Sequence, residues 1–388
     1  MSKGRILLYR WNAYNYLDIC ETFSLMGYEI DEVRFEPESY DEDKEFYDIL
    51  KNKILTTSYL FAFSVNYFPI ISNVCDEYGL PYLCWTCDNP LISMYHKSVF
   101  NSVNHIFTFD KTNLIEFKRM GVKNIYYLPL AVDSGRIQSI LTVADDLYEY
   151  QNEISFVGSL YEKNSYDSME SVLPDYLRGY FEGIMEVQSD LYGTNILENA
   201  LTEDILKELD KYYTLEKSAD SFSSLQLIFS TTVLGFKTAE IQRKRELLKL
   251  SRINDVSLYS NSDATDLITV NSKGSLDYYS EMPKVFNQSR INLNFTIPNI
   301  KTGIPLRVWD ILGSGGFCLT NYQAELSDYF KDGQDLAWFY GTEDLIEKAK
   351  WYLAHDSERR RIAHSGFNKT REHNYMKRLD QMLTTVNF

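Results

Sequence analysis

The sequence predicts an α/β protein built on two parallel, doubly wound sheets. Its 388 residues exceed the usual size of one domain, so two or three domains are expected. Short apolar runs alternate with amphipathic stretches in two blocks of chain that meet near residue 150. Such an alternation of strands with helices indicates parallel sheets. The composition, 44% hydrophobic and 24% charged, is that of a globular protein and argues against disorder.

The first block, residues 1–150, is expected to form one domain. Its predicted strands are the apolar runs 5–9, 59–65, 81–86, 105–109 and 124–133. Its predicted helices are 14–27, 69–79 and 112–121, two of which end at Gly27 and Gly121. The longest apolar stretch, residues 59–71, contains Asn66 and spans about 13 residues, whereas a bilayer span needs roughly 20. We therefore expect a buried strand there and no integral membrane segment.

The second block, residues 151–366, is expected to form a second domain of the same kind. Its predicted strands are 153–161, 255–260, 266–270, 291–296 and 317–320, and a helical segment at 165–252 interrupts them. A helix beginning at Thr342 places Leu345, Ala349, Tyr352 and Leu353 on one face. Another helix begins near Glu358. A last helix, within residues 367–388, forms a third segment.

Charge and cysteine content restrict the partners and the compartment. The chain has 39 Lys and Arg against 55 Asp and Glu, a net charge of −16, which repels nucleic acid and anionic lipid. Charged residues interrupt the first apolar stretch too early for a signal peptide. The five cysteines are odd in number and scattered, so no disulfide framework is implied. We expect a soluble, cytoplasmic protein.

The most informative stretch is residues 290–323, which is read as strand, loop, helix, glycine-rich turn and strand. Thr302 and Gly303 stand just before the helix, and Pro305 lies in its first turn. Free amides at such a helix start favour a phosphate. Arg307 adds a cation for a diphosphate, and Asp310, three residues later, is a carboxylate able to accept two ribose hydroxyls. The alternative is a surface Arg–Asp pair, worth roughly 0.2–0.5 kcal/mol.

The segment TGIPLRVWDILGSGGFCLTNYQAEL, followed by YFKDGQDLAWF, closely resembles the CgeB-like spore-maturation glycosyltransferases. FVGSLY, LCWTCDNPL and the stretch from Lys273 to Thr296 are similar to that family as well. The resemblance implies a GT-B fold with two facing Rossmann-like domains. In that fold the second domain binds the nucleotide-sugar, the first presents the acceptor, and the last helix crosses back to the first domain.

The resemblance also implies roles for individual residues. Asp310 takes the position of the acid that holds the donor ribose in related enzymes, but the second acid of that pattern, eight residues earlier, is replaced by Thr302. This departure puts a retaining active site in doubt. Gly158 and Ser159 match the glycine turn that opens the donor domain, where a plain tight turn is the alternative. Asn294 is near the end of its predicted strand. It is expected either to line the ligand cleft between the two domains of such a fold or to be an ordinary polar strand residue.

On the acceptor side, Asp88 follows a predicted strand, at the edge of the sheet where ligands bind. An acid there can serve as general base for an acceptor hydroxyl. The alternative is a turn, which the composition Asp-Asn-Pro favours. His96 and Asp110 are lesser candidates for the catalytic role.

Other signals favour ordinary structure. Cys84 and Cys87 form one C-x-x-C without a second pair, which makes a zinc or redox site improbable. The acids at 41–43 are expected to start a solvated helix, and the basic runs 242–249 and 358–361 are expected to be solvated helix faces. No metal and no other cofactor is expected.

The sequence thus predicts a GT-B glycosyltransferase that moves a sugar from a nucleotide-diphosphate sugar, UDP-sugar favoured, to a glycan or protein acceptor. Fixed amides and Arg307 would neutralise the leaving diphosphate without metal. Two alternatives stay open: a non-catalytic protein that binds a nucleotide-sugar, and a sugar epimerase of the same shape. The sugar, the base, the acceptor, the stereochemical outcome and the oligomeric state are not predicted.

Overall fold

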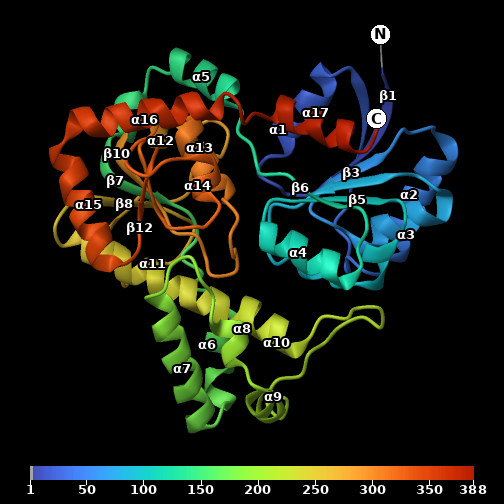
Figure 1. Cartoon of the computed structure of the whole chain (residues 1–388), viewed down its shortest axis with the longest axis horizontal. Coiled ribbons are helices and arrows are strands. Elements are labelled where there is room, and N and C mark those ends of the chain that lie inside the picture. The colour runs from blue at the N-terminus through green and yellow to red at the C-terminus, as the bar shows by residue number, and fades with distance from the viewer. Residues whose placement is uncertain (1–2) are drawn as a thin grey trace. The chain divides into compact units, whose positions relative to one another are not determined.

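The computed structural model describes residues 3–388, and the chain divides into two compact units. The first comprises residues 1–131, 216–223 and 373–388, and the second comprises residues 132–215 and 224–372. The division thus falls at 131/132, whereas the sequence placed it near 150. Each unit contains one six-stranded parallel sheet with helices on both faces (Figure 1).

The first unit has the strand order β2-β1-β3-β4-β5-β6, and every pair is parallel. The strands are β1 (Gly4–Arg10), β2 (Tyr28–Arg34), β3 (Ala62–Val65), β4 (Tyr82–Trp85), β5 (Asn104–Thr108) and β6 (Ile125–Tyr127). The strand order reverses between β1 and β3, and ligands of such sheets bind beyond the carboxyl ends of the strands at this point. Asn66 and the segment Thr86–Asp88 follow β3 and β4 at that edge.

The helices of the first unit are α1 (Tyr16–Leu25), α2 (Lys44–Thr56), α3 (Pro69–Tyr78), α4 (Lys111–Met120) and α17 (Tyr375–Thr385), with the short 3-10 turns η1 (Ile92–Met94) and η2 (Lys97–Phe100). Figure 1 shows α1 and α17 on one face of the sheet and α3 and α4 on the other. The last helix packs against α1, and the Tyr375 ring lies 6.1 Å from the Trp85 ring.

The second unit has the strand order β12-β11-β10-β7-β8-β9, again with parallel pairs only. Its strands are β7 (Asn152–Val157), β8 (Val256–Tyr259), β9 (Asn271–Ser272), β10 (Ser289–Asn294), β11 (Cys318–Asn321) and β12 (Ala337–Phe339). Its reversal lies between β7 and β10. The loops after these two strands are therefore the expected ligand edge of this unit.

Helices cover both faces of the second sheet. They are α5 (Ser134–Val143), η3 (Leu147–Tyr150), α12 (Met282–Gln288), α13 (Leu306–Gly313), α14 (Leu326–Tyr329), α15 (Thr342–Ala354) and α16 (Asp356–Thr370), together with α11 (Phe236–Ser251). The predicted apolar face of α15 is confirmed, because Leu345 and Ala349 are fully buried in the core beneath the sheet.

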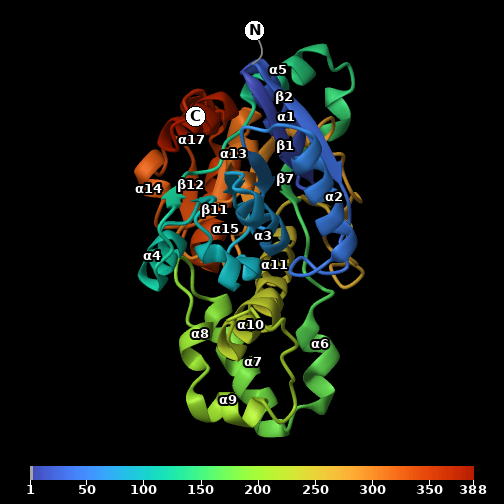
Figure 2. The ribbon, with the colours of Figure 1, turned by 90° about the vertical axis from the view of Figure 1, so that its right-hand side faces the viewer.

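A helical insertion between β7 and β8 has a core of its own. It contains α6 (Ser165–Met169), η4 (Glu170–Val172), α7 (Asp175–Ser189), α8 (Leu197–Ala200), α9 (Glu203–Leu209), α10 (Leu225–Ile228) and the π-helical turn η5 (Phe229–Gly235), and it ends in α11. Leu177, Phe181 and Phe229 are fully buried in this second core. Figure 2 shows α7, α8 and α9 gathered apart from the strands of their own unit.

One part of the insertion, residues 216–223, belongs to the first unit. Ser221 forms an isolated antiparallel bridge with His96, and the Asp220 carboxylate accepts a hydrogen bond from Lys97 Nζ at 2.7 Å. The Phe222 ring lies 5.9 Å from the Tyr95 ring. These contacts attach the segment to the turn at η2.

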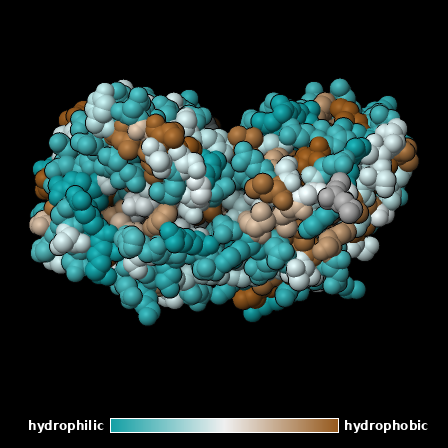
Figure 3. Space-filling model, turned by 90° about the horizontal axis from the view of Figure 1, so that it is seen from above, coloured by the Kyte–Doolittle hydropathy of each residue, from teal (hydrophilic) through white to brown (hydrophobic). Residues whose placement is uncertain are grey.

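Two expectations about local structure are wrong. Residues 266–270 form turns rather than a strand, with Leu267 buried and Ile268 87% exposed, and the edge strand β9 comes directly afterwards. The basic run 242–249 is not a solvated face, because Arg243 is only 8% exposed and Glu246 is fully buried. Within residues 3–388, no helix is both long and apolar enough to cross a bilayer. Figure 3 shows a mostly hydrophilic face with small, separate hydrophobic groups.

Candidate functional site

The loop after β7 carries Gly158 and Ser159 at the carboxyl edge of the second sheet. The Gly158 amide donates to the Tyr259 carbonyl at 3.1 Å, which ties the loop to the end of β8. A Cβ atom on Gly158 would lie 3.4 Å from the Phe156 ring, which is an ordinary van der Waals contact, so the space above that ring does not by itself require glycine. The Ser159 side chain is exposed, and its Oγ accepts the Tyr161 amide at 3.0 Å.

Arg243 of α11 is a buried cation at this edge that the sequence analysis did not single out. Its guanidinium donates to the Ser159 carbonyl at 2.5 Å and to the Phe295 carbonyl at 2.7 Å, so it joins the ends of β7 and β10. It also lies 4.8 Å from the centre of the Tyr161 ring. Burial lowers the pKa of Arg243, Tyr161 opposes this shift, and the nearby Arg307 adds to it. The two arginines therefore concentrate positive charge at the ligand edge.

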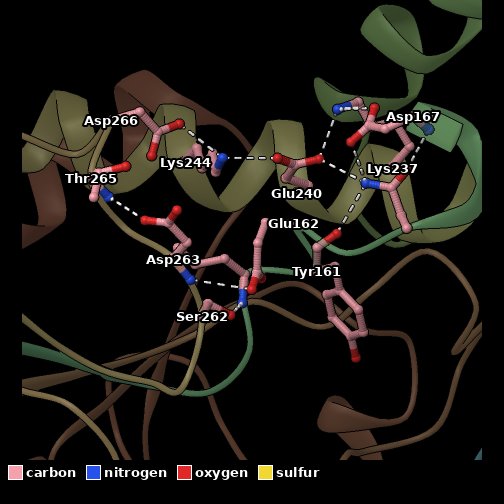
Figure 4. A network of polar contacts seen from close by, with 12 residues as sticks. Tyr161, Glu162, Asp167, Lys237, Glu240, Lys244, Ser262, Asp263, Thr265 and Asp266 are labelled. Carbon is pink, nitrogen blue, oxygen red and sulfur yellow. Dashed lines mark hydrogen bonds and ion pairs between the residues drawn. The ribbon is translucent and has the colours of Figure 1, made fainter.

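The loop between Gly158 and α6 is held by a chain of ion pairs (Figure 4). Lys237 pairs with Asp167 at 2.7 Å and with Glu240 at 2.8 Å, and Lys244 pairs with Glu240 and with Asp266 at 2.8 Å each. The two pairs with Glu240 lie within α11, and the pairs with Asp167 and Asp266 join α11 to the segments that follow β7 and β8. Because Glu240 is buried, this network fixes the position of the glycine turn relative to Arg243.

The start of α13 is the second component of this edge. The helix begins at Leu306, with Pro305 as its N-cap residue, so Thr302 and Gly303 lie in the loop before it as predicted. Arg307 is in the first turn, and its side chain is 23% exposed. Its guanidinium contacts the Met282 sulfur and lies 5.6 Å from the centre of the Phe286 ring. These contacts hold a partly exposed cation at the start of a helix, an arrangement that favours phosphate.

Asp310 lies one turn further along α13 and is 4% exposed. Its Oδ2 is 3.6 Å from Arg307 Nη1, and its Oδ1 accepts the Tyr278 hydroxyl at 3.0 Å. The Arg–Asp pair that was the simpler interpretation is thus present, but it is partly buried rather than on the surface. A carboxylate oriented by both a cation and a hydroxyl is suited to accept further hydrogen bonds from a sugar.

Thr302, the neutral residue in the acidic position, has a carboxylate beside it. Its hydroxyl donates to Glu325 Oε1 at 2.7 Å, and its carbonyl accepts the Glu325 amide at 3.1 Å. Glu325 is 2% exposed and follows β11 rather than preceding α13. No sequence spacing connects Glu325 to Asp310, so only the fold could bring this acid to the loop.

Asn294 belongs to a polar ladder between neighbouring strands. Its Nδ2 donates to Thr296 Oγ1 at 3.0 Å and to Thr320 Oγ1 at 2.9 Å. The Asn321 side chain accepts the Thr296 amide at 2.6 Å. All four residues are buried. These hydrogen bonds are those expected of an ordinary polar strand residue, the alternative interpretation of Asn294.

In the first unit, Asp88 is held by a strained asparagine. Asn66, which follows β3, has φ +63° and is 3% exposed. Its Nδ2 donates to Asp88 Oδ2 at 2.6 Å, and its Oδ1 accepts the Cys87 amide at 2.9 Å. Asp88 itself is exposed, but the protein atoms around it raise its pKa, and the bond from Asn66 opposes that rise. A carboxyl with a raised pKa is a better proton acceptor than an ordinary aspartate.

His96 and Asp110 lie in capping positions. His96 is 4% exposed, and its Nδ1 accepts the Ser98 amide at the start of η2. Asp110 is fully buried, and its Oδ1 accepts the Thr112 amide at 2.8 Å at the start of α4. These bonds give both residues a structural role, and Asp88 is the candidate base with the most suitable surroundings.

The C-x-x-C cysteines are free thiols. Burial raises the pKa values of Cys84 and Cys87, and Asp88 adds to the effect at Cys87, so both stay protonated. Among residues 3–388, no three His, Cys, Asp or Glu side chains are arranged to hold a metal ion.

Residues 243–384 match the protein family described as "Glycosyl transferase-like". The matched segment begins at Arg243 and includes α13 with Arg307 and Asp310. No curated protein is similar enough in sequence to count as a match.

Solved structures with a similar fold include the following three. HepE of Anabaena, solved with UDP and glucose, has a TM-score of 0.59 at 7% identity over 99% of both chains. The sucrose-phosphate synthase of Thermosynechococcus elongatus has a TM-score of 0.57 at 8% identity over 99% of this chain and 98% of the other. WaaG, a glycosyltransferase involved in lipopolysaccharide biosynthesis, has a TM-score of 0.53 at 9% identity over 98% of this chain and 99% of the other.

The predicted architecture is therefore confirmed, since these full-length matches and the two six-stranded parallel sheets are those of the GT-B fold. The match over residues 243–384 shows that this part of the chain is similar to glycosyl transferase-like proteins, and the fold of the whole chain is similar to that of known glycosyltransferases.

Proposed function

We propose that this chain is a CgeB-like glycosyltransferase that moves a sugar from a UDP-sugar to a hydroxyl of a glycan or protein acceptor, in the cytoplasm and without a bound metal. The observation that carries the proposal is the grouping of Arg243, Arg307 and Asp310 at the carboxyl edge of the second sheet. HepE, which shares this fold, has been solved with UDP-glucose, so UDP is the first nucleotide to test.

The donor would bind with its diphosphate at the start of α13. There the free amides of the helix and the Arg307 guanidinium supply hydrogen bonds and positive charge. The diphosphate gains negative charge as the bond to the sugar breaks. Hydrogen-bond donors that already point at that charge lower the activation barrier of transfer without having to reorganise. For this reason the proposed mechanism requires no metal. Arg243 supports the same region by holding the ends of β7 and β10.

The nucleoside would be held by Asp310, whose carboxylate would accept the two ribose hydroxyls. Tyr278 and Arg307 orient this carboxylate before the ligand arrives, which reduces the entropy lost on binding. Glu325, beside Thr302, would place a second buried acid near the transferred sugar.

The acceptor would be activated by Asp88 in the first unit. Its carboxylate would take the proton of the attacking hydroxyl, and Asn66 holds the carboxylate in one orientation. The raised pKa of Asp88 increases its strength as a base.

The proposal is tested by the thermal stability and calorimetric affinity of the protein with UDP and with uridine, in metal-free buffer. A ligand at 100 times its Kd stabilises the folded protein by about 2.7 kcal/mol, which raises Tm by several degrees or less in a chain of this size. We expect the Arg307→Ala variant to lose affinity for UDP and to keep its affinity for uridine. The exposed Arg119→Ala variant is the matched control and should bind both as the wild type does.

If Arg307→Ala lost affinity equally for UDP and for uridine, Arg307 could not be the residue that binds the diphosphate. Binding of UDP only after Mg²⁺ is added would overturn the metal-free mechanism. Transfer activity would then be measured as the release of UDP in the presence of a panel of UDP-sugars and acceptors. UDP binding without release or transfer would favour the non-catalytic alternative.

A further inference from the structure

A second, unassigned pocket of about 760 Å³ lies at the opposite edge of the second sheet. It is lined by the first residues of the central strands, including Asn152 of β7, Ser257 of β8 and Ser289 of β10, and by Gly316 before β11. Because these strands are parallel, their amino ends are at the edge away from Gly158, Arg243 and Arg307. The pocket is therefore separate from the proposed donor site, and its volume is within the range of small-molecule sites, roughly 300–1,000 Å³.

The pocket concentrates positive charge within an acidic chain. Its lining contains four cations, Lys273, Arg290, Arg359 and Arg360, against the two carboxylates of Glu153 and Asp255. The whole chain, by contrast, carries a net charge of −16. This local excess of cations favours an anionic ligand.

Three arginines compete for few carboxylates here. Asp356 contacts Arg359 and accepts from Arg360 Nε at 2.7 Å, while Arg290 reaches Glu153 only at 3.6 Å. Arg359 is 5% exposed, and burial together with the charges of Arg290 and Arg360 lowers its pKa. A bound anion would relieve this repulsion between guanidinium groups, and planar guanidinium groups suit carboxylate and phosphate oxygens in particular.

The rest of the lining suits hydroxyl groups. It includes five side-chain amides and two serine hydroxyls, which are those of Gln151, Asn152, Asn271, Asn287, Gln288, Ser257 and Ser289. Amides and hydroxyls both donate and accept hydrogen bonds, as sugar hydroxyls require. Phe317 is the one aromatic residue in the lining, and it is 2% exposed, so the pocket offers a ligand no aromatic stacking surface.

From this combination we propose that the pocket binds a short saccharide that carries a carboxylate or a phosphate. The arginines and Lys273 would bind the anionic group, and the amides would bind the hydroxyls. This inference does not depend on the donor assignment, because the two sets of residues share no member.

The test is isothermal titration of the full chain with four probes: glucuronic acid, glucose 6-phosphate, glucose and inorganic phosphate. The variant is Lys273→Gln combined with Arg360→Gln, since both side chains are exposed and their loss should not prevent folding. Arg361→Gln is the matched control, because Arg361 neighbours Arg360 on α16 but does not line the pocket. Arg307→Ala serves as the control for the donor site.

We expect at least one of the two anionic sugars to bind about tenfold more tightly than glucose and inorganic phosphate, because only it satisfies both groups of residues. Its affinity should fall by about tenfold or more in the double variant and stay unchanged in Arg361→Gln and Arg307→Ala. Preference for glucuronic acid or for glucose 6-phosphate would identify the anionic group.

Three outcomes would overturn the proposal. One is that neither anionic sugar binds more tightly than glucose, and another is that inorganic phosphate alone binds as tightly as the sugars. The third is binding that survives in the double variant or is lost in Arg307→Ala, which would place the sugar elsewhere.

Discussion

Replacing Asp310 by asparagine should weaken the preference of the protein for a ribose over a deoxygenated sugar. Asp310 is 4% exposed and accepts the Tyr278 hydroxyl at 3.0 Å, with Arg307 at 3.6 Å. Asparagine keeps the shape of the side chain and an oxygen for Tyr278, so the fold should be retained. What is lost is the negative charge, and with it the strength of the hydrogen bonds that ribose hydroxyls would donate.

The size of the effect follows from the change of acceptor. A hydrogen bond to a charged group contributes ~1.5–3 kcal/mol, and one between neutral groups contributes ~0.5–1.5 kcal/mol. The substitution therefore weakens each ribose hydrogen bond by about 1–1.5 kcal/mol. For two hydroxyls the loss is about 2–3 kcal/mol, which raises Kd by roughly 30- to 150-fold.

Calorimetric titration with UDP and with 2′,3′-dideoxy-UDP measures this directly. The wild type should bind UDP far more tightly than the dideoxy compound, and in Asp310→Asn this preference should shrink by roughly 30- to 150-fold. Asp380→Asn, the same change at an exposed position of α17, is the control and should leave both affinities unchanged. An equal loss for both nucleotides in Asp310→Asn, or no loss at all, would refute the assignment of Asp310 to the ribose.

Three further predictions concern the proposed base Asp88, the buried Arg243 and the turn at Gly316. Because the pKa of Asp88 is raised, kcat/KM should fall as the pH drops through a value above the ordinary 3.8. Asp88→Asn should abolish transfer and leave the affinity for UDP unchanged. Residual transfer with an unaltered pH profile would exclude Asp88 as the base. Arg243→Lys should weaken UDP binding, because a compact ammonium lacks the planar fork with which the guanidinium reaches both carbonyls. Arg245→Lys should leave UDP binding unchanged, and equal affinities in the two variants would contradict this role. Gly316→Ala should lower Tm by several degrees, because the new Cβ would lie 2.4 Å from a carbonyl oxygen, at a cost of about 1–3 kcal/mol. Gly179→Ala, with open space around the glycine, should leave Tm unchanged. An unchanged Tm for Gly316→Ala would show that the turn at Gly316 can relax.

The edges of the sheets were the hardest part of the fold to predict. The strand β2 alternates charged and apolar residues and carries Glu29, Asp31 and Glu32, so it has no continuous apolar run. The edge strands β9 and β12 contain two and three residues, too few for a periodic signal. Central strands such as β3 and β10 are buried on both faces, and their apolar runs were recognised for that reason.

The buried polar residues of the site were missed for a related reason. Arg243 shares a helix face with Leu247 and Leu250, at i, i+4 and i+7, so helical periodicity could have indicated that it is buried. Asn66 was a visible interruption of an apolar run, but its bond to Asp88 joins residues 22 positions apart. Such pairings depend on which strands are neighbours, and spacing along the chain carries no information about that.

By itself the sequence determined the fold class, the alternation of strands and helices, and the helix start that carries Arg307 and Asp310. These features depend on local periodicity and on residues within a few positions of one another, which any stretch of chain displays. Only the tertiary structure decided that Glu325 stands beside Thr302, that Arg243 joins the ends of β7 and β10, and that the arginines of α16 meet Arg290 at the other edge of the sheet. Those contacts arise because a parallel sheet brings the ends of distant strands together, and burial then makes each polar group pair with whatever neighbour the fold supplies.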